Sequence, residues 1–332
     1  MQSLWLENQS LSLRDIPKPY KPGEALIRIR LSGICGTDLE LLRGYYPFRG
    51  VPGHEFVGEV LSVAEPDEAA HRGTQSQQTL DYAKWIGKRV VGEINVACGG
   101  CEQCGNGCPT HCEQRSVLGI ANRNGVHAEY TTLPLTNLHI VPDSIPDEAA
   151  VFTEPLAAAL EIQEQVHIQP TDRVLLVGAG RLGQLIAQTL ALTGCDLHVL
   201  ARHPIQKALL ESRKIRLIAE DAIQPRRWDV VVEATGSPSG FEVARRALRP
   251  RGILVLKSTY RGDMAVTWSP FVVDEITIVG SRCGPFAPAL HLMESAQVDP
   301  ARLIAGQYPL TNALEAMAAA QQPGMLKVLL KP

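Results

Sequence analysis

Residues 173–190 read RVLLVGAGRLGQLIAQTL, and this stretch decides the fold class. It combines an apolar run typical of a strand, a glycine-rich loop and a helical pattern without proline. Small residues in such a loop let the backbone approach a pyrophosphate, and the N-terminus of the following helix favours its negative charge. The stretch therefore predicts a dinucleotide-binding loop with GxGxxG spacing, formed by Gly178, Gly180, Arg181, Leu182 and Gly183.

The surrounding sequence extends this unit into a sheet. The apolar runs LHVLA, DVVVEAT, GILVLKS and TIVGS follow, and helical patterns separate them. Continuously apolar strands that alternate with helices are typical of a parallel sheet covered on both faces. We therefore expect an α/β, doubly wound (Rossmann) cofactor domain over residues 155–281. The helical pattern DEAAVFTEPLAAALEIQEQV, residues 147–166, leads into it.

The N-terminal part of the chain has a different periodicity. ALIRIRL (25–31) alternates apolar and polar residues as a half-buried strand does, and FVGEVLSV (56–63) reads similarly. Residues 65–84 are polar and featureless, which indicates a surface loop without chemistry. These patterns predict a β-rich catalytic domain over residues 1–154, rejoined by residues 282–332.

Composition limits the function classes. At 332 residues the chain is longer than a single hydrophobic core usually grows, so two domains are expected. The 32 basic and 35 acidic side chains give a net charge of -3, which provides no broad field for nucleic acid or anionic lipid. The sequence shows neither a secretory signal pattern nor an apolar run of membrane-spanning length. We therefore expect a cytoplasmic protein with small-molecule partners, no nucleic acid and no membrane.

Five of the eight cysteines lie close together in CGGCEQCGNGCPTHC. Four of them have the spacing to close around one tetrahedral zinc ion, and four thiolates leave no open position, which is typical of a structural site. A short glycine-rich lobe has little apolar surface to bury, so the metal would supply the free energy that orders it. The predicted ligands are Cys98, Cys101, Cys104 and Cys112. A disulfide knot and an iron–sulfur cluster are the alternatives, with Cys108 a bystander and His111 redundant.

A second, sparser set lies upstream. GICGTDLE contains Cys35, and PGHEFVGEV contains His54 followed by Glu55. A thiolate and an imidazole from two loops at strand ends are a plausible start of a catalytic zinc site, which needs a third protein ligand. Taken alone, Cys35 is as readily a buried small hydrophobe and His54 a core histidine. The neighbouring glycines, with Thr37 and Asp38, favour a site.

In this order, GICGTD, GHEFVGEV, the cysteine lobe, a Glu-Pro-Leu segment and GAGRLG resemble the medium-chain zinc-dependent alcohol dehydrogenases. The resemblance runs nearly end to end and is strongest to the branch of sorbitol, threonine and glucose dehydrogenases. It implies a GroES-like catalytic domain that carries the zinc lobe. It also implies two zinc ions per chain, one catalytic and one structural, and a homodimer or homotetramer.

The resemblance implies a catalytic zinc held by Cys35, His54 and an acidic residue. Two acids compete for that place: Glu55, next to the histidine, and Glu154 in FTEPLAAAL. Relatives with this segment place either carboxylate on the metal or bridge one of them through water. Both therefore remain candidates.

The proton path is the point at which the chain departs from the family. Thr37 resembles the family hydroxyl that begins a relay from the substrate oxygen, although a threonine here could also cap a helix. Where relatives usually show a relay histidine, this chain has Glu40. Zinc lowers the pKa of a bound alcohol and so favours hydride transfer to nicotinamide, and the released proton needs such a path.

The end of the second strand of the cofactor domain, LHVLARHP, predicts the cofactor. An NAD-specific domain normally ends this strand with an acid for the ribose hydroxyl, whereas this chain has Arg202, then His203, with Lys207 one helical turn further. Positive charge favours the 2'-phosphate of NADP. NAD stays possible because arginine can stack on adenine, and a solvated basic surface is the third alternative.

Weaker implications of the resemblance concern Thr235 in EATG and Ser258 in KSTY, which would line the cofactor site, and Lys327, which would reach the pyrophosphate. For the substrate pocket the sequence offers Tyr45, Tyr46, Phe48 and His127 as lining candidates. His127 stands where relatives commonly show an aromatic or aliphatic residue.

These patterns predict a zinc-dependent oxidoreductase that transfers a hydride between an alcohol and NAD(P)+. The alcohol would be a secondary alcohol, a polyol or a sugar-like compound. One alternative is a carbonyl reductase that consumes NADPH. The alternative from another class is a zinc-stabilised, nucleotide-binding redox sensor without turnover.

Overall fold

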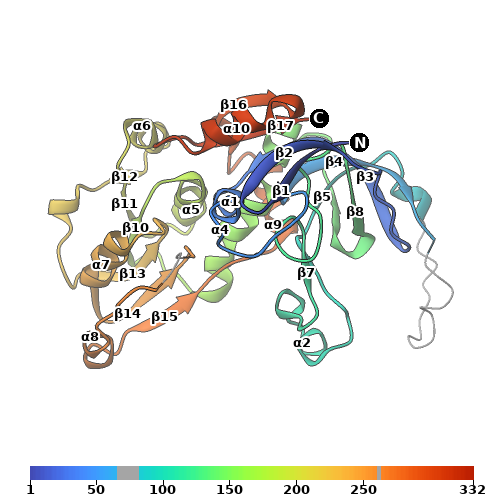
Figure 1. Cartoon of the computed structure of the whole chain (residues 1–332). Coiled ribbons are helices and arrows are strands. Elements are labelled where there is room, and N and C mark those ends of the chain that lie inside the picture. Colours follow the sequence, from blue (N-terminus) through green and yellow to red (C-terminus); the bar gives the residue numbers. More distant parts are fainter. Residues whose placement is uncertain (66–81, 260–262) are drawn as a thin grey trace. The chain divides into compact units, whose positions relative to one another are not determined.

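The chain folds into two compact units, coloured along the sequence in Figure 1. The computed structural model describes residues 1–65, 82–259 and 263–332. Unit 1 consists of Met1–Glu154 together with Ile304–Pro332, and unit 2 consists of Pro155–Leu303. The loop predicted over residues 65–84 lies largely outside the described residues, and its end forms a short 3-10 turn at Tyr82–Lys84.

Unit 1 is built on a seven-stranded sheet in which all pairs except β16–β17 are antiparallel. The strand order is β16-β17-β3-β4-β5-β9, and β8 pairs with the first half of β3. Along β3, Ala25, Ile27 and Ile29 are buried while Arg28 and Arg30 are exposed, which confirms the predicted alternation. The strands are β3 (Glu24–Ile34), β4 (Glu55–Val63), β5 (Arg89–Gly92), β8 (Tyr130–Pro134), β9 (Leu138–Ile140), β16 (Ile304–Pro309) and β17 (Lys327–Lys331).

The two ends of the chain meet in this unit. β17 pairs with the end of β3, with Val328 opposite Ile34. Leu4 near the N-terminus and Met317 near the C-terminus belong to the same buried apolar cluster as Ile34, so burial of apolar surface holds the C-terminal segment in unit 1. The other elements here are β1 (Gln2–Glu7), β2 (Ser10–Asp15), α1 (Gly36–Leu42), α3 (Asp147–Ala150) and α10 (Ala313–Ala320).

The cysteine lobe has very little regular structure. Figure 1 shows α2 (Glu102–Gly105) and β7 (Ser116–Val117) away from the strands of the main sheet. β7 pairs with β6 (Asn95–Val96) over two residues, and Val117 also bridges to Ala121. Two short strands, one helical turn and the 3-10 turn Pro109–His111 bury little apolar surface, which is the condition under which a bound metal is needed to order a segment.

Unit 2 contains a six-stranded, fully parallel sheet in the order β12-β11-β10-β13-β14-β15. The chain moves outward from β10 in one direction and then, starting at β13, in the other, which confirms the doubly wound fold. Val174, Leu175, Leu176 and Val177 of β10 are all buried, as expected for a strand with helices on both faces. The strands are β10 (Arg173–Val177), β11 (Asp196–Leu200), β12 (Arg216–Leu217), β13 (Trp228–Glu233), β14 (Leu248–Leu256) and β15 (Thr277–Gly280). The helices are α4 (Thr153–Gln165), α5 (Arg181–Ala191), α6 (Pro204–Ser212), α7 (Pro238–Ala247), α8 (Ser269–Val273) and α9 (Phe286–Glu294).

The return to unit 1 comes at Ile304, whereas the sequence places it at 282. Two contacts keep the intervening segment in unit 2. A Cβ at Gly284 would lie 2.0 Å from the carbonyl oxygen of Ala157, so the chain passes directly against α4. Further on, the backbone N–H of Asp299 donates to Oε1 of Gln188 in α5.

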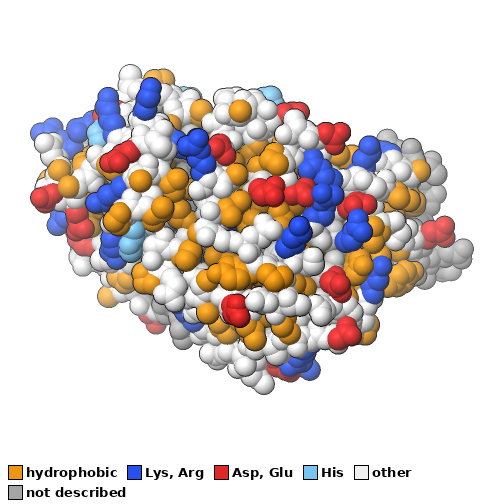
Figure 2. All heavy atoms as spheres, turned by 90° about the horizontal axis from the view of Figure 1, so that it is seen from above, with side chains coloured by type: hydrophobic (Ala, Val, Ile, Leu, Met, Phe, Trp, Pro, Cys, Tyr) orange, Lys and Arg blue, Asp and Glu red, His pale blue; other side chains and the backbone are white. Residues whose placement is uncertain are grey.

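The surface carries both signs of charge. Figure 2 shows Lys and Arg side chains interspersed with Asp and Glu side chains on the face that it displays. Among the described residues, no helix combines the length and the apolar character that crossing a bilayer requires.

The glycine loop yields a test of the packing in unit 2. A Cβ at Gly183 would lie 2.2 Å from the carbonyl oxygen of Gly178, whereas a Cβ at Gly280 would meet no atom within 4 Å. We expect Gly183→Ala to lower the free energy of unfolding by about 1–3 kcal/mol, because the helix must move away from the strand. Gly280→Ala should change it by less than about 0.5 kcal/mol. Urea unfolding of both variants measures the difference, and equal stabilities would contradict the close approach.

Candidate active site

Two adjacent strands bring the upstream metal-ligand candidates together. Cys35 follows β3 and precedes α1, and His54 directly precedes Glu55, the first residue of β4. The β3–β4 register pairs Gly33 with Glu55, so Cys35 and His54 lie at neighbouring ends of two adjacent strands. Candidate ligand atoms of Cys35, His54 and Glu55 all lie within 4.8 Å of one another. A group of this kind can hold a metal ion with three protein ligands, which leaves a position open.

A buried carboxylate joins the two loops. Oδ2 of Asp38 accepts a hydrogen bond from the backbone N–H of Cys35 (2.8 Å), and Oδ1 accepts one from that of Gly53 (3.1 Å). Nδ1 of His54 lies 3.5 Å from Oδ1 of Asp38, which leaves Nε2 as the nitrogen available to a metal. A carboxylate behind a ligating histidine fixes the orientation of the ring and makes it a stronger ligand.

The electrostatics of these groups suit a cation. Burial alone raises the pKa of Asp38, but the charge of His54 and the hydrogen bonds around the carboxylate outweigh burial and lower it. Burial likewise lowers the pKa of His54, whereas the Asp38 carboxylate and Cys35 outweigh it and raise it well above its ordinary value. The site therefore keeps a negative charge at Asp38 and favours positive charge beside it. A metal ion that displaces the proton of His54 also supplies this positive charge.

Glu55 has one oxygen in use and one without a hydrogen-bond partner. Oε2 forms a buried ion pair with Nζ of Lys327, while Oε1 is buried without a hydrogen bond. Gly33 makes room for this carboxylate, since a Cβ there would overlap Oε2. Zinc is commonly bound by sulfur, nitrogen and oxygen ligands together. The thiol of Cys35, the imidazole of His54 and this unpaired, buried oxygen of Glu55 provide one of each.

Lys327, which the resemblance assigns to the pyrophosphate, pairs with Glu55 within unit 1. Its side chain is buried in unit 1, its amine is committed to Glu55, and Nζ lies 5.6 Å from the ring centre of Phe152. The pairing of β17 with β3 brings it to this position. The role toward the cofactor stays a prediction.

The other predicted catalytic residues lie outside this group. Glu154 lies in the first turn of α4 and does not belong to the set of ligand atoms within 4.8 Å. Glu40 accepts a hydrogen bond from Nη1 of Arg43 (2.7 Å) on the surface of α1. The hydroxyl of Thr37 lies 3.9 Å from Sγ of Cys35, close to the predicted metal. The structure thus brings Thr37 near the ligands and engages Glu40 in an ion pair.

Among the substrate-pocket candidates, the interpretation of His127 is wrong. Tyr45 and Tyr46 are exposed and Phe48 is half-buried, but His127 is fully buried and cannot line a pocket open to substrate. Its Nδ1 lies 3.0 Å from Oγ of Ser32, behind the metal-ligand loops. A single sequence gives no signal for this burial, because the ring is enclosed by segments far apart in the chain.

The four lobe cysteines also lie together, with ligand atoms within 4.8 Å of one another. Sγ of Cys101 is 3.5 Å from Sγ of Cys104 and 3.8 Å from that of Cys112, and the backbone N–H of Cys98 donates to Cys112 Sγ (3.2 Å). All eight cysteines are free thiols. The side chain of Cys108 is exposed and stands outside the group, as expected for a bystander.

Their ionisation shows why a cation fits. Backbone N–H groups of Cys104 and Glu113 lower the pKa of Cys101 to about 6. Burial and the neighbouring Cys101 raise that of Cys104 to about 12. One thiolate thus opposes the formation of the next. Four thiolates at these distances need a bound cation to compensate their charge, and a zinc ion in closed tetrahedral coordination would supply it.

Unit 2 contains a pocket of about 820 Å³ at the carboxyl ends of β10, β11 and β13. Gly178 has φ +105°, a conformation that favours glycine, and Gly180 precedes the first residue of α5. The loop thus presents a helix N-terminus to the pocket, as a pyrophosphate site requires. Of the predicted cofactor residues, six line the pocket: Gly178, Gly180, Arg202, His203, Lys207 and Thr235.

Other predicted cofactor residues stand next to this pocket or behind it. Arg181, Leu182 and Gly183 form the first turn of α5. A Cβ on Gly236, which follows Thr235, would lie 3.7 Å from Cβ of Ser258, so these two loops meet.

Sequence reasoning missed three acids in this region. Glu211 and Glu220 also line the pocket, and buried Glu233 accepts hydrogen bonds from the backbone N–H and the hydroxyl of Thr235. Glu233 ends an apolar strand, and a charged residue at the end of such a run could have indicated a functional position.

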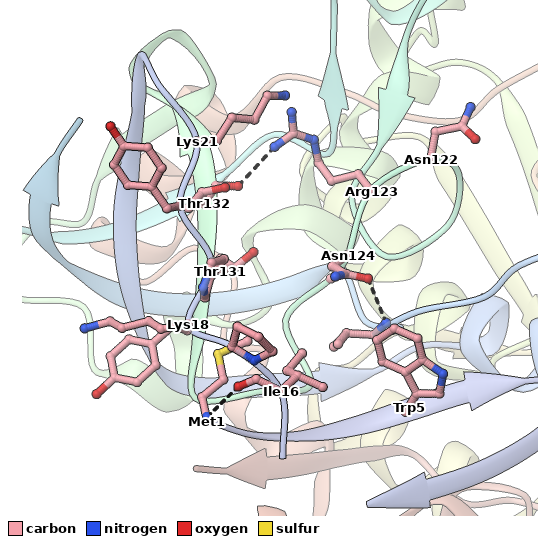
Figure 3. Close-up of a pocket in the computed structure, with 16 residues that line it drawn as sticks. Met1, Trp5, Ile16, Lys18, Lys21, Asn122, Arg123, Asn124, Thr131 and Thr132 are labelled. Atoms are coloured by element: carbon pink, nitrogen blue, oxygen red, sulfur yellow. Dashed lines mark hydrogen bonds between the residues drawn. The ribbon is translucent and has the colours of Figure 1, made fainter. Parts of the chain in front are cut away.

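A second pocket, of about 480 Å³, lies in unit 1 (Figure 3). Its cationic side chains are engaged within the protein: Arg123 donates to both oxygens of Glu24 at 2.8 Å, and Lys21 lies 3.0 Å from the same carboxylate. Lys18 stacks over Tyr130, with Nζ 4.2 Å from the ring centre. None of the predicted site residues lines this pocket, so it is separate from both metal-ligand groups.

Comparison with known proteins agrees with this geometry. Residues 21–143 match the alcohol dehydrogenase GroES-like domain. D-arabinitol dehydrogenase 1 of Uromyces fabae is 30% identical over 331 residues, covering 93% of this chain and 90% of that protein. This chain belongs to the zinc-dependent medium-chain alcohol dehydrogenases. Erythritol/L-threitol dehydrogenase of Mycolicibacterium smegmatis is 31% identical over 330 residues, covering 90% of this alcohol dehydrogenase and 88% of the relative.

Solved structures support the same assignment. The alcohol dehydrogenase TADH from Thermus sp. ATN1 has a TM-score of 0.84 and 27% identity, covering 100% of this chain and 99% of its own. An Escherichia coli CFT073 relative, rspB, solved with NADH, also gives a TM-score of 0.84 and 27% identity, with the same coverage. The protein is an NAD(P)-dependent alcohol dehydrogenase, which confirms the predicted fold and enzyme class.

Proposed function

We propose that this alcohol dehydrogenase oxidises a secondary hydroxyl group of a small polyol or related hydroxy compound at a zinc ion held by Cys35, His54 and Glu55. The main support is the buried group of three ligand atoms, in which one oxygen of Glu55 has no hydrogen-bond partner. Relatives named for D-arabinitol and for erythritol and L-threitol support a polyhydroxy substrate. A second zinc ion would occupy the four-cysteine lobe.

Glu55 is favoured over Glu154 as the acidic ligand. Its carboxylate lies within 4.8 Å of the candidate ligand atoms of Cys35 and His54, and Glu154 does not belong to that group. Lys327 holds one oxygen of Glu55 and partly compensates its charge, while the other oxygen faces no competing donor among the described residues. The ion pair therefore leaves a single oxygen for a metal.

When bound, zinc would supply a Lewis acid that lowers the pKa of the substrate hydroxyl, and nicotinamide would accept the hydride. The chain's own residues supply position and proton transfer. We expect Asp38 to orient His54, and we expect Thr37, near Cys35 Sγ, to relay the substrate proton by taking it up while giving its own hydroxyl proton to solvent water. Glu40 is not the next carrier in this proposal, because its carboxylate is paired with Arg43.

Zinc analysis tests the metal assignment. The wild-type chain should hold two zinc ions, Cys35→Ala should retain the lobe zinc alone, and Cys101→Ala should lose the lobe zinc, because each substitution removes a thiolate ligand. Cys108→Ala is the matched control and should keep both, since its exposed thiol belongs to neither group. A single tightly held zinc that Cys35→Ala leaves unchanged would defeat the catalytic-site assignment.

The reaction follows from absorbance of the reduced cofactor with a panel of polyols, aldoses, hydroxy-amino acids and simple secondary alcohols. We expect the highest kcat/KM with a polyol. Cys35→Ala should lower that value by at least about 100-fold, because the metal contributes several kcal/mol to transition-state stabilisation. Cys108→Ala should leave it unchanged. Full activity of Cys35→Ala would refute the proposed mechanism.

For the cofactor we propose a preference for NADP over NAD. The side chains of Arg202 and Lys207 line the pocket of unit 2 and are exposed, and neither forms an ion pair with another described residue. An acid at the end of β11, the usual partner of a ribose hydroxyl, is replaced by this positive charge. A 2'-phosphate would meet two cations there.

Arg202→Asp tests that preference. It should lower kcat/KM with NADP by at least about 10-fold, because an aspartate would repel the 2'-phosphate, and efficiency with NAD should fall less or rise. Arg216→Asp is the control, since Arg216 is an exposed arginine of the same unit that does not line the pocket. Initial rates with each cofactor give the ratio. An Arg202→Asp enzyme with full NADP efficiency would contradict this explanation.

We further propose a homo-oligomer that forms through the β15 edge of unit 2. β15 ends the six-stranded sheet and leaves one side of its backbone open. Ile278 on this strand is 37% exposed, and Val272 and Val273 of α8 are 76% and 79% exposed. An open strand edge beside exposed apolar side chains is suited to pairing with a second copy.

Ile278→Lys should shift the protein from dimer or tetramer toward smaller species at micromolar concentration, because charge at the strand edge opposes pairing. Leu192→Lys, an exposed apolar residue elsewhere in unit 2, should not. Sedimentation velocity separates the species. Identical distributions for the wild type and Ile278→Lys would place any interface elsewhere.

A further inference from the structure

His127 is fully buried beside the metal-ligand loops but is not itself a ligand candidate. Its Nδ1 lies 3.0 Å from Oγ of Ser32 on β3. Its Nε2 lies 3.5 Å from Oδ2 of Asp38 and has no hydrogen bond to the described part of the chain. A buried ring nitrogen has no water to bind, so a facing carboxylate is its main source of electrostatic stabilisation.

Asp38 therefore stands between two imidazoles. Oδ1 lies 3.5 Å from Nδ1 of His54, and Oδ2 lies 3.5 Å from Nε2 of His127. Each oxygen also accepts one backbone N–H, from Gly53 and Cys35 respectively. Two backbone N–H groups and two ring nitrogens thus surround the carboxylate, and one of these ring nitrogens belongs to His127.

The His127 ring also supports the loop that precedes His54. Gly53 has φ +96°, and a Cβ there would lie 2.6 Å from Nδ1 of His127. The backbone N–H of His127 donates to the carbonyl oxygen of Pro52 (3.1 Å). The ring packs against the turn from which the ligand histidine projects, so its volume as well as its nitrogen atoms bear on the geometry of His54.

We propose that His127 is a positioning residue for the catalytic zinc site, acting on His54 through Asp38. Nδ1 of the ring pairs with the hydroxyl of Ser32, and Nε2 faces Oδ2 of Asp38 at 3.5 Å. Because Oδ2 is turned toward His127, Oδ1 is left for His54. The chain Ser32–His127–Asp38–His54 thus extends the support of the metal beyond its first carboxylate. This role rests on the proposed zinc site at Cys35 and His54.

The test compares His127→Phe, which keeps the ring volume and loses both nitrogens, with His127→Gln, which keeps an N–H donor near the position of Nε2. A chromophoric chelator competes for zinc in the purified holoenzyme. His127→Phe should weaken the Cys35-dependent zinc by about 10–100-fold, as loss of a group behind a metal ligand usually does. His127→Gln should stay within about 3-fold of the wild type. The lobe zinc should bind equally in all three and is the internal control.

A second readout is the visible spectrum of cobalt at the Cys35 site. Its ligand-field bands should shift in His127→Phe, because the His54 ring turns, and return toward the wild-type position in His127→Gln. A purely structural role of His127 would lower the melting temperature of the zinc-depleted protein without moving these bands. Wild-type zinc affinity and bands in His127→Phe would overturn the proposal, and so would a His127→Gln enzyme as impaired as His127→Phe.

If His127→Phe does not fold, Ser32→Ala together with His127→Gln decides the matter. Ser32→Ala keeps the histidine and removes only the hydroxyl that pairs with Nδ1, so it should weaken the Cys35-dependent zinc in the same direction by a smaller factor. Unchanged affinity in Ser32→Ala would then count against the chain of contacts. A wild-type protein without Cys35-dependent zinc would refute the zinc site itself, which is a separate result.

Discussion

The buried carboxylate of Asp38 is the constraint on which the upstream site depends. Its two oxygens accept hydrogen bonds from the backbone of Cys35 and of Gly53, so a single side chain fixes both ligand loops relative to each other. Burying a charged group without partners would cost several kcal/mol, which is why donors surround it. The same charge orients His54 and favours a cation beside it. Removing the carboxylate would therefore release the loops and the ligand together.

The two metal-ligand groups illustrate different ways to build a site. In the lobe, the ligands follow one another within a short segment that buries little apolar surface. Backbone N–H groups lower the pKa of Cys101, while burial and the neighbouring Cys101 raise that of Cys104. In the upstream group, a packed sheet supplies the rigidity, and the ligands lie just after β3 and at the start of β4. The first group has reason to need a metal for folding. The second is organised by hydrogen bonds and can leave a coordination position open to substrate.

Burial in the sheet also explains the pairing of Glu55 with Lys327. Each would be costly alone in an apolar surrounding, and together they leave one carboxylate oxygen uncommitted. In unit 2 the constraint is steric, since Gly183 allows α5 to approach the carbonyl of Gly178 closely enough to present its N-terminus to the pocket. Charge thus positions the metal-ligand candidates in unit 1, and close backbone packing positions the cofactor loop in unit 2.

Local features of this protein could be predicted from its amino-acid sequence. The cysteine lobe, the glycine loop and the basic residues after β11 each lie within a short segment, so spacing alone predicts which atoms can meet. The strand and helix periodicities likewise predicted a β-rich part and a doubly wound sheet. Features that join distant segments became visible in the folded chain. Glu55 and Lys327 are 272 residues apart, and His127 reaches Asp38 across several strands. Their meeting depends on sheet register and burial, which no local pattern records.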